Sequence, residues 1–192
     1  MELFDLTGKV AVITGSSRGI GKAIAERMAE HGAKVVISSR KAGPCDEVAA
    51  AINEKHPGAA ISVPASISSK ADLQRLVDET NTAFGQIDIV VCNAATNPYF
   101  GPMAKIEDDA FRKILDNNII ANNWLIQMAA PQMRERRDGA VIIISSIGGL
   151  RGSTGIGAYN ISKAADFQLA RNLAVRSEER RVGKECRSRC SP

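Results

Sequence analysis

The stretch "KVAVITGSSRGIG", residues 9–21, decides the fold of this chain. It opens with an uninterrupted apolar run over 9–14, which is typical of a strand buried on both faces of a parallel sheet. Three glycines then precede a segment with helical apolar spacing. A glycine-rich turn between a strand and a helix presents backbone N–H groups and the positive helix end, an arrangement that favours a dinucleotide pyrophosphate.

The rest of the body repeats this alternation. Further apolar runs at 33–38, 60–65, 87–92 and 140–145 predict strands, and helical patterns occupy 20–31, 46–55, 70–84, 107–136 and 159–175. The segment 107–136 is long enough for two helices, and Gly32 and Gly85 stand where helix C-caps are expected. We therefore predict an α/β fold with a doubly wound parallel sheet, Rossmann-like, in strand order 3-2-1-4-5.

The composition bounds the classes of partner. The chain has 192 residues, 44% of them hydrophobic, which suffices for one globular domain, assigned to residues 1–175. With no membrane-length apolar run and no leader pattern, we expect a cytoplasmic protein without a membrane partner. The net charge is +4, but residues 176–192 hold six basic residues against three acidic ones. The body is nearly neutral, so we expect no nucleic-acid partner.

The cysteines divide in the same way. Cys45 and Cys92 lie far apart in the body, and Cys92 ends an apolar run, as a small buried residue would. Cys186 and Cys190 lie in the tail, distant from both histidines. We expect free thiols and no metal site.

The glycine-rich turn and the end of the second strand suggest which dinucleotide binds. Gly15 permits the tight turn, Gly19 lets the backbone approach the ligand closely, and Gly21 allows the helix to pack closely on the strand. After the second strand come Ser39, Arg40 and Lys41, and Arg18 lies in the turn itself. An arginine can grip a 2′-phosphate in bidentate fashion, whereas NAD sites usually offer a carboxylate there. This favours NADP(H) over NAD(H), although Lys41 is equally typical of a solvated loop.

Two later stretches place reactive groups beyond the carboxyl ends of strands, where ligands of such sheets bind. "SSIGG" (145–149) follows the fifth apolar run, and "YNISK" (159–163) opens the last helix. Tyr159 and Lys163 are one helical turn apart, so their side chains project from one face. A phenol ordinarily titrates near ~10, and a neighbouring ammonium favours its phenolate. With Ser146 as hydrogen-bond donor, Tyr159 could exchange a proton while a hydride moves between nicotinamide and a carbonyl carbon.

Taken in order, these motifs resemble the short-chain dehydrogenase/reductase family. The resemblance rests on "LTGKVAVITGSSRGIG" (6–21), "NAA" (93–95), Ser146 and "YNISK", and it spans about 6–175. It implies that Tyr159 is the acid/base, Lys163 its modulator and a ribose ligand, and Ser146 the residue that orients substrate. The family's fourth catalytic residue, an Asn that holds a water, maps to Asn118, with Asn117 as the alternative. From the residues alone, both asparagines would be assigned to the helix surface.

The resemblance also implies a cofactor-binding set and an assembly. The partners that the resemblance implies are a small-molecule carbonyl or alcohol substrate and, for the full-length protein, further copies of itself in a homodimer or homotetramer. "ISSRK" and "NAATNPYFG" are similar to the branch of NADPH-dependent carbonyl (retinal-type) reductases. The expected cofactor-binding residues are Gly15, Ser17, Arg18, Gly19, Ile20, Gly21, Ser39, Arg40, Asn93, Ala94, Ala95, Tyr159 and Lys163.

The tail departs from the family. Members continue with another strand, a substrate-binding loop and a last strand announced by Pro-Gly, whereas "RSEERRVGKECRSRCSP" (176–192) has neither an apolar run nor Pro-Gly. It resembles a translated sequencing adapter, so we interpret 176–192 as non-native and the catalytic domain as incomplete. Weak or absent activity and open apolar sheet edges or faces are then expected. The alternative function is a dinucleotide-binding fragment or sensor without catalysis.

Overall fold

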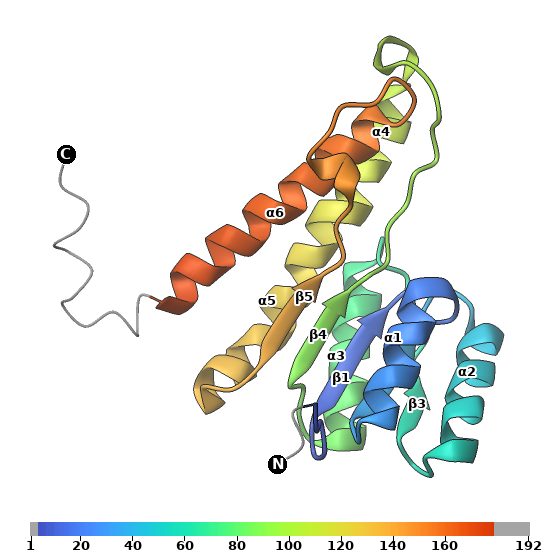
Figure 1. Ribbon diagram of the computed structural model, residues 1–192, viewed down its shortest axis with the longest axis vertical. Helices are drawn as coiled ribbons and strands as arrows, with labels where there is room; N and C mark the ends of the chain where they lie inside the picture. Colours follow the sequence, from blue (N-terminus) through green and yellow to red (C-terminus); the bar gives the residue numbers. More distant parts are fainter. Residues whose placement is uncertain (1–3, 179–192) are drawn as a thin grey trace, which may run out of the picture.

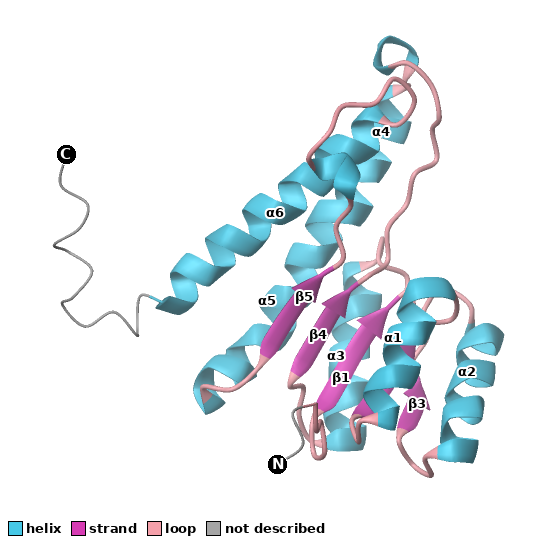
Figure 2. Cartoon of the chain, in the orientation of Figure 1, coloured by secondary structure: helices cyan, strands magenta, loops and turns pink. Residues whose placement is uncertain are grey.

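The sheet has five parallel strands. The computed structural model describes residues 4–178, and Figures 1 and 2 show the sheet between two helical layers. The strand order β3-β2-β1-β4-β5 confirms the predicted topology, and each strand is shorter than its apolar run. The strands are β1 (Val10–Thr14), β2 (Lys34–Ser38), β3 (Ala60–Ser62), β4 (Ile89–Cys92) and β5 (Ala140–Ile143).

The helices follow the prediction apart from their bounds. They are α1 (Gly19–Glu30), α2 (Ala42–Lys55), α3 (Lys70–Phe84), α4 (Asp108–Leu115), α5 (Ala121–Arg136) and α6 (Gly157–Glu178). The predicted start of α2 at 46 is wrong, because Pro44 is its third residue and the first turn needs no N–H there. The predicted end of α6 at 175 is also wrong. Cys186, Cys190 and the rest of 179–192 lie outside the described residues.

The segment between α4 and α5 is not a simple break between two helices. A single π turn, η2 (Asp116–Ile120), joins them into one continuous rod. Short 3₁₀ turns, η1 (Met103–Lys105) and η3 (Ile147–Gly149), punctuate the loops after β4 and β5. These loops and the turn after β1 all leave the sheet at the carboxyl ends of its strands.

Both faces of the sheet are packed, which accounts for the continuous apolar strands. Ala11 and Ile13 face α1 and α2 in one buried cluster, while Val12 faces α3 and α5 in the other. Leu169 and Leu173 bring α6 against this second face, and Figure 1 shows α6 lying alongside α5. No helix within residues 4–178 is long and apolar enough to cross a membrane.

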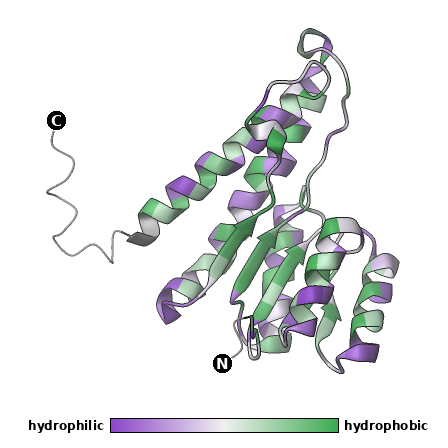
Figure 3. Ribbon diagram, viewed as in Figure 1, coloured by the Kyte–Doolittle hydropathy of each residue, from purple (hydrophilic) through white to green (hydrophobic). Residues whose placement is uncertain are grey.

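The outer strand β5 is apolar but exposed. Within the described residues β5 pairs only with β4, and Val141 and Ile142 are 38% and 40% exposed. Figure 3 shows that this strand is as hydrophobic as the buried β1 and β4. Beyond it, Ile147 and Leu150 are also exposed. The open apolar edge agrees with the expectation from the sequence.

We predict that this edge makes the 192-residue chain self-associate. An unpaired apolar strand recruits a second strand, and a lysine on it opposes that pairing. Light scattering coupled to size exclusion should show mass rising with protein concentration, and Val141→Lys should suppress the rise. Lys105→Ala, which leaves β5 untouched, serves as the control. A mass independent of concentration for the parent chain would contradict this prediction.

Candidate active site

The turn after β1 is built on close backbone approach. Gly15 and Gly19 have positive φ angles of 68° and 57°, a region that favours glycine. A Cβ on Gly21 would lie 2.5 Å from the Gly15 carbonyl oxygen and 2.5 Å from Asn93 Nδ2. The missing side chain therefore lets the first turn of α1 rest on the turn after β1.

Polar groups on neighbouring strands fix the shape of this turn. Asn93 Nδ2 donates to the carbonyls of Thr14 (2.9 Å) and Gly15 (3.2 Å). The Thr14 hydroxyl accepts from the backbone N–H groups of Asn93 and Ala94, each at 3.1 Å. Ser16 Oγ donates to a β1 carbonyl and accepts from the Ser38 N–H at 2.8 Å. The contacts of Asn93 and Ala94 thus brace the turn. Sequence reasoning missed Thr14 and Ser16, although hydroxyls bordering a glycine were the available signal.

The outer surface of the turn is open and cationic. Arg18, Ile20 and Arg40 are exposed, and neither arginine makes an ion pair with a described residue. A Cβ on Gly19 would meet nothing within 4 Å. Ser39 is half-buried, as is Ser17, whereas Ala95 is exposed. An open backbone turn at a helix N-terminus fits the pyrophosphate of a dinucleotide.

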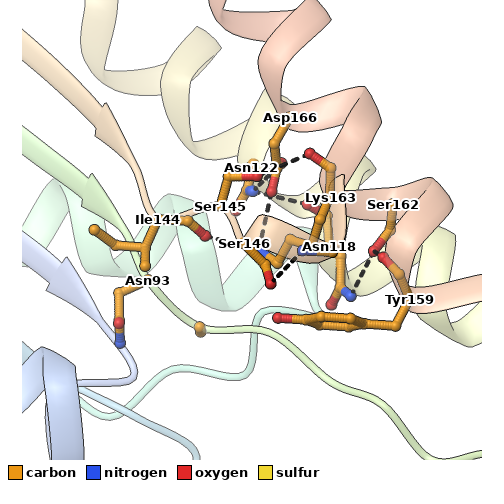
Figure 4. A network of polar contacts seen from close by, with 12 residues as sticks. Asn93, Asn118, Asn122, Ile144, Ser145, Ser146, Tyr159, Ser162, Lys163 and Asp166 are labelled. Atoms are coloured by element: carbon orange, nitrogen blue, oxygen red, sulfur yellow. Dashed lines mark hydrogen bonds and ion pairs between the residues drawn. The ribbon is translucent and has the colours of Figure 1, made fainter. Parts of the chain in front are cut away.

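Tyr159 and Lys163 lie together at the start of α6, as predicted. Lys163 Nζ stands 5.8 Å from the centroid of the Tyr159 ring, and Figure 4 shows both side chains on one side of the helix. The Lys163 side chain is buried, and its Nζ donates to the Ile144 carbonyl at 2.8 Å and to Asp166 Oδ2 at 2.9 Å. Two of its three donors are therefore used, which leaves one for the phenol or a ligand.

Asp166 and Asn122 extend this pair into the protein and were missed by sequence reasoning. Asn122 Nδ2 donates to Asp166 Oδ1 at 3.2 Å and to the Asn118 carbonyl at 2.7 Å. Burial raises the pKa of Asp166, and its contacts with Lys163 and Asn122 oppose that rise. The available signal was a carboxylate one helical turn beyond Lys163. It was overlooked because exposed helical faces carry such residues routinely.

Asn118 is a structural clamp as well as a candidate catalytic residue. Its Oδ1 accepts from the Thr96 N–H at 2.7 Å, and its Nδ2 donates to the Thr96 carbonyl and to Ser162 Oγ, both at 3.0 Å. Assigning Asn117 and Asn118 to the helix surface is wrong, since both are buried. They fall in the π turn η2, whose extra residue turns two consecutive side chains inward.

Ser146 lies on the loop that follows β5. Its half-buried Oγ accepts from the Gly148 N–H at 3.1 Å, which leaves its own proton free to point toward a ligand. The neighbouring Ser145 hydroxyl donates to the Lys163 carbonyl at 2.8 Å and ties this loop to α6. The three candidate catalytic groups therefore lie near the carboxyl ends of the strands, where the glycine-rich turn also lies (Figure 4). They are Tyr159, Lys163 and Ser146.

Cys92 is inert at the base of the site. It is buried, as predicted, and burial raises the pKa of its thiol to about 12, so it remains protonated. Within residues 4–178, no group of three or more His, Cys, Asp or Glu side chains is arranged to hold a metal ion.

Comparison with known proteins gives consistent relatives. The family model for short chain dehydrogenases matches residues 9–185. Dehydrogenase/reductase SDR family member 4 from Oryctolagus cuniculus is 39% identical over 94% of this chain and 69% of its own length. The Homo sapiens protein of that name is 38% identical, with 94% and 65% covered. The chain thus spans about two thirds of the length of these relatives.

A solved structure shares the architecture. The 7α-hydroxysteroid dehydrogenase complexed with NADH and 7-oxo glycochenodeoxycholic acid superposes with a TM-score of 0.86 at 32% identity. The match covers 92% of this chain and 68% of that one.

The close approach at Gly21 can be tested directly. Gly21→Ala places a methyl group against Gly15 and Asn93, and overpacking of this kind costs about 1–3 kcal/mol. Denaturant unfolding should show that loss, and binding of a reduced nicotinamide dinucleotide, followed by its fluorescence, should weaken. Gly43→Ala in α2, where a Cβ meets nothing within 4 Å, is the matched control and should be neutral or stabilising. Equal stability of the two variants would contradict the packing argument.

Proposed function

Because this chain belongs to the short-chain dehydrogenase/reductase family, we propose that it is an NADP(H)-dependent oxidoreductase that interconverts a carbonyl and an alcohol. The observation that carries the proposal is the Tyr159–Lys163 contact, beside Ser146 and at the same sheet edge as the glycine-rich turn. A protein that only senses a dinucleotide needs the turn but not a proton-transfer group.

In this proposal each side chain has one task. When bound, the nicotinamide ring supplies or accepts the hydride. The Tyr159 hydroxyl gives its proton to the carbonyl oxygen during reduction and takes it back during oxidation. The Lys163 ammonium favours the phenolate left behind, and the Ser146 hydroxyl donates a hydrogen bond to the reacting oxygen. Asn118 holds the loop after β4 against α6 through Thr96 and Ser162.

The preference for NADP(H) is argued from Arg18 and Arg40. Arg18 lies in the turn and Arg40 follows β2. Both are exposed and free of ion pairs with described residues, so each can contact a 2′-phosphate. The structural neighbour is described with NADH, which makes NAD(H) the competing cofactor. The other proposed contacts, through Ser17, Ile20, Ser39, Ala95 and the backbone at Gly15, Gly19 and Gly21, would serve either dinucleotide.

Substrate class and assembly are extended from the family. We propose a small ketone or aldehyde as substrate, in keeping with the carbonyl reductase branch. For assembly, α4, α5 and α6 provide the surfaces for a homodimer or homotetramer. We also propose that residues 1–175 form the cofactor-binding and catalytic unit and that 176–192 is not native. Amplifying the locus from source DNA tests the last point, because an intact reading frame encoding this tail would refute it.

Tyr159→Phe should remove most of the oxidoreductase activity of the full-length protein. General acid/base catalysis contributes roughly 10²–10⁴-fold, so we expect a fall of that size in kcat, with cofactor binding little changed. The assay is NADPH consumption with a panel of ketones and aldehydes, and Tyr99→Phe is the matched control. Binding of NADPH without turnover of any carbonyl or alcohol would favour the dinucleotide sensor instead.

Arg40→Ala should separate the two cofactors. Hydrogen bonds to charged groups contribute about 1.5–3 kcal/mol, so NADPH should bind roughly 10–100-fold more weakly. NADH binding should hardly change, because NADH has no 2′-phosphate. Lys41→Ala tests the neighbouring cation and should have little effect. Both affinities can be measured by titrating the fluorescence of the reduced cofactor, and equal losses for NADPH and NADH would contradict the assignment.

A further inference from the structure

We infer that Asp166 is a positioning residue that holds the Lys163 ammonium in place and offsets its charge at Tyr159. The inference rests on the proposed function for its catalytic meaning, but its physical content concerns the contacts among Tyr159, Lys163 and Asp166 and the groups that hold them. The established family pattern assigned above accounts for the tyrosine and the lysine, and it contains no carboxylate at this position.

The contacts make Asp166 the charged partner of Lys163. Asp166 and Lys163 are 1% and 2% exposed, and their charged atoms are 2.9 Å apart. The Ile144 carbonyl accepts a second Nζ proton at 2.8 Å, so the ammonium is held between the end of β5 and α6. From the far side, Asn122 donates to the other carboxylate oxygen at 3.2 Å. The ammonium is thus fixed from two directions.

The surroundings contain few other charges. The titratable groups that face the pair are Cys92, at the end of β4, and Tyr159, on α6 itself. Cys92 is a neutral thiol. The groups that α5 and the loop after β5 direct at the pair are uncharged, namely the Asn122 amide and the Ile144 carbonyl. The charges of this cluster are therefore one cation, Lys163, and one anion, Asp166, which balance each other.

This balance changes the usual argument for a tyrosine–lysine pair. A lone ammonium beside a phenol favours the phenolate, whereas a nearby carboxylate disfavours it. Because Asp166 is in direct contact with the Lys163 ammonium, it cancels part of that effect. Asp166 thereby sets how readily the Tyr159 proton leaves, without touching the substrate.

A purely stabilising role would explain the pair poorly. Removing two charges from water is costly, and replacing a buried ion pair by well-packed apolar residues is often neutral or stabilising. Leu169 and Leu173 show that the same helix supplies apolar side chains where packing requires them. A carboxylate at 166 therefore calls for an electrostatic explanation.

The chain permits a test that needs neither cofactor nor substrate. It has two tyrosines, Tyr99 and Tyr159, so phenolate absorbance in a Tyr99→Phe background reports Tyr159 alone. In that background, Asp166→Asn should shift the titration midpoint to lower pH by roughly one unit, because the cation loses its counter-charge. Lys163→Met should shift it to higher pH, and the Lys163→Met/Asp166→Asn double variant should return close to the parent.

The controls separate charge from folding. Asp109→Asn removes an exposed carboxylate on α4 and should leave the midpoint unchanged, while Asp166→Glu should largely restore it. Thermal unfolding identifies variants that do not fold. If Asp166→Asn fails to fold, the Lys163→Met/Asp166→Leu variant, which leaves no buried charge unpaired, is compared with Lys163→Met. An unchanged midpoint in folded Asp166→Asn, or a shift to higher pH, overturns the inference.

The catalytic consequence has its own readout. In an active protein, Asp166→Asn should move the limb of the kcat/KM pH profile that reports Tyr159 to lower pH, in step with the phenolate titration. That limb is the alkaline one for carbonyl reduction, where Tyr159 is the acid, and the acidic one for alcohol oxidation, where it is the base. If the titration shifts while no variant turns over a carbonyl, the inference stands and the proposed function fails. If the parent turns over substrate but Asp166→Asn shifts neither the titration nor the profile, the proposed function stands and the inference fails.

Discussion

The structure depends on the parallel direction of its five strands. Because all strands run the same way, every strand-to-helix connection leaves the sheet at the carboxyl ends of the strands. The turn after β1, the loop bearing Asn93 and the loop bearing Ser146 meet there without any long excursion of the chain. Helix α6 then brings Tyr159 and Lys163 to the same place, and Ser145 ties the loop after β5 to it. The parallel direction of the strands is thus what assembles the site.

The sequence predicts this frame well because its signals are local and repeated. Each strand is a short apolar run, each helix has its own periodicity, and the spacing of Tyr159 and Lys163 fixes their common face. Gly21 is informative because its pattern in the strand–turn–helix segment is local, although one of the two contacts that exclude a side chain there comes from Asn93, after β4. Where a feature depends on one turn of chain, the sequence is sufficient.

Features that depend on register or on buried partners could not be predicted. The π turn η2 adds one residue to a helical turn, so Asn117 and Asn118 face inward where a regular helix would expose one of them. No single-residue preference announces that insertion. Likewise, Asp166 is an ordinary polar helix residue until α5 and β5 close around it. Its role comes from Asn122, 44 positions away along the chain, and from Lys163, which is also held by the Ile144 carbonyl 19 positions from Lys163.

The buried pair also connects stability to chemistry. Lys163 can remain charged away from water only if acceptors surround it, and the structure supplies a carbonyl and a carboxylate. A carbonyl alone would leave the positive charge of Lys163 uncompensated near Tyr159, whereas the carboxylate of Asp166 offsets that charge. Holding both fixes the ammonium geometrically while moderating its field. Tyr159 therefore lies beside an oppositely charged pair, so a change to either partner alters the charge near its ring.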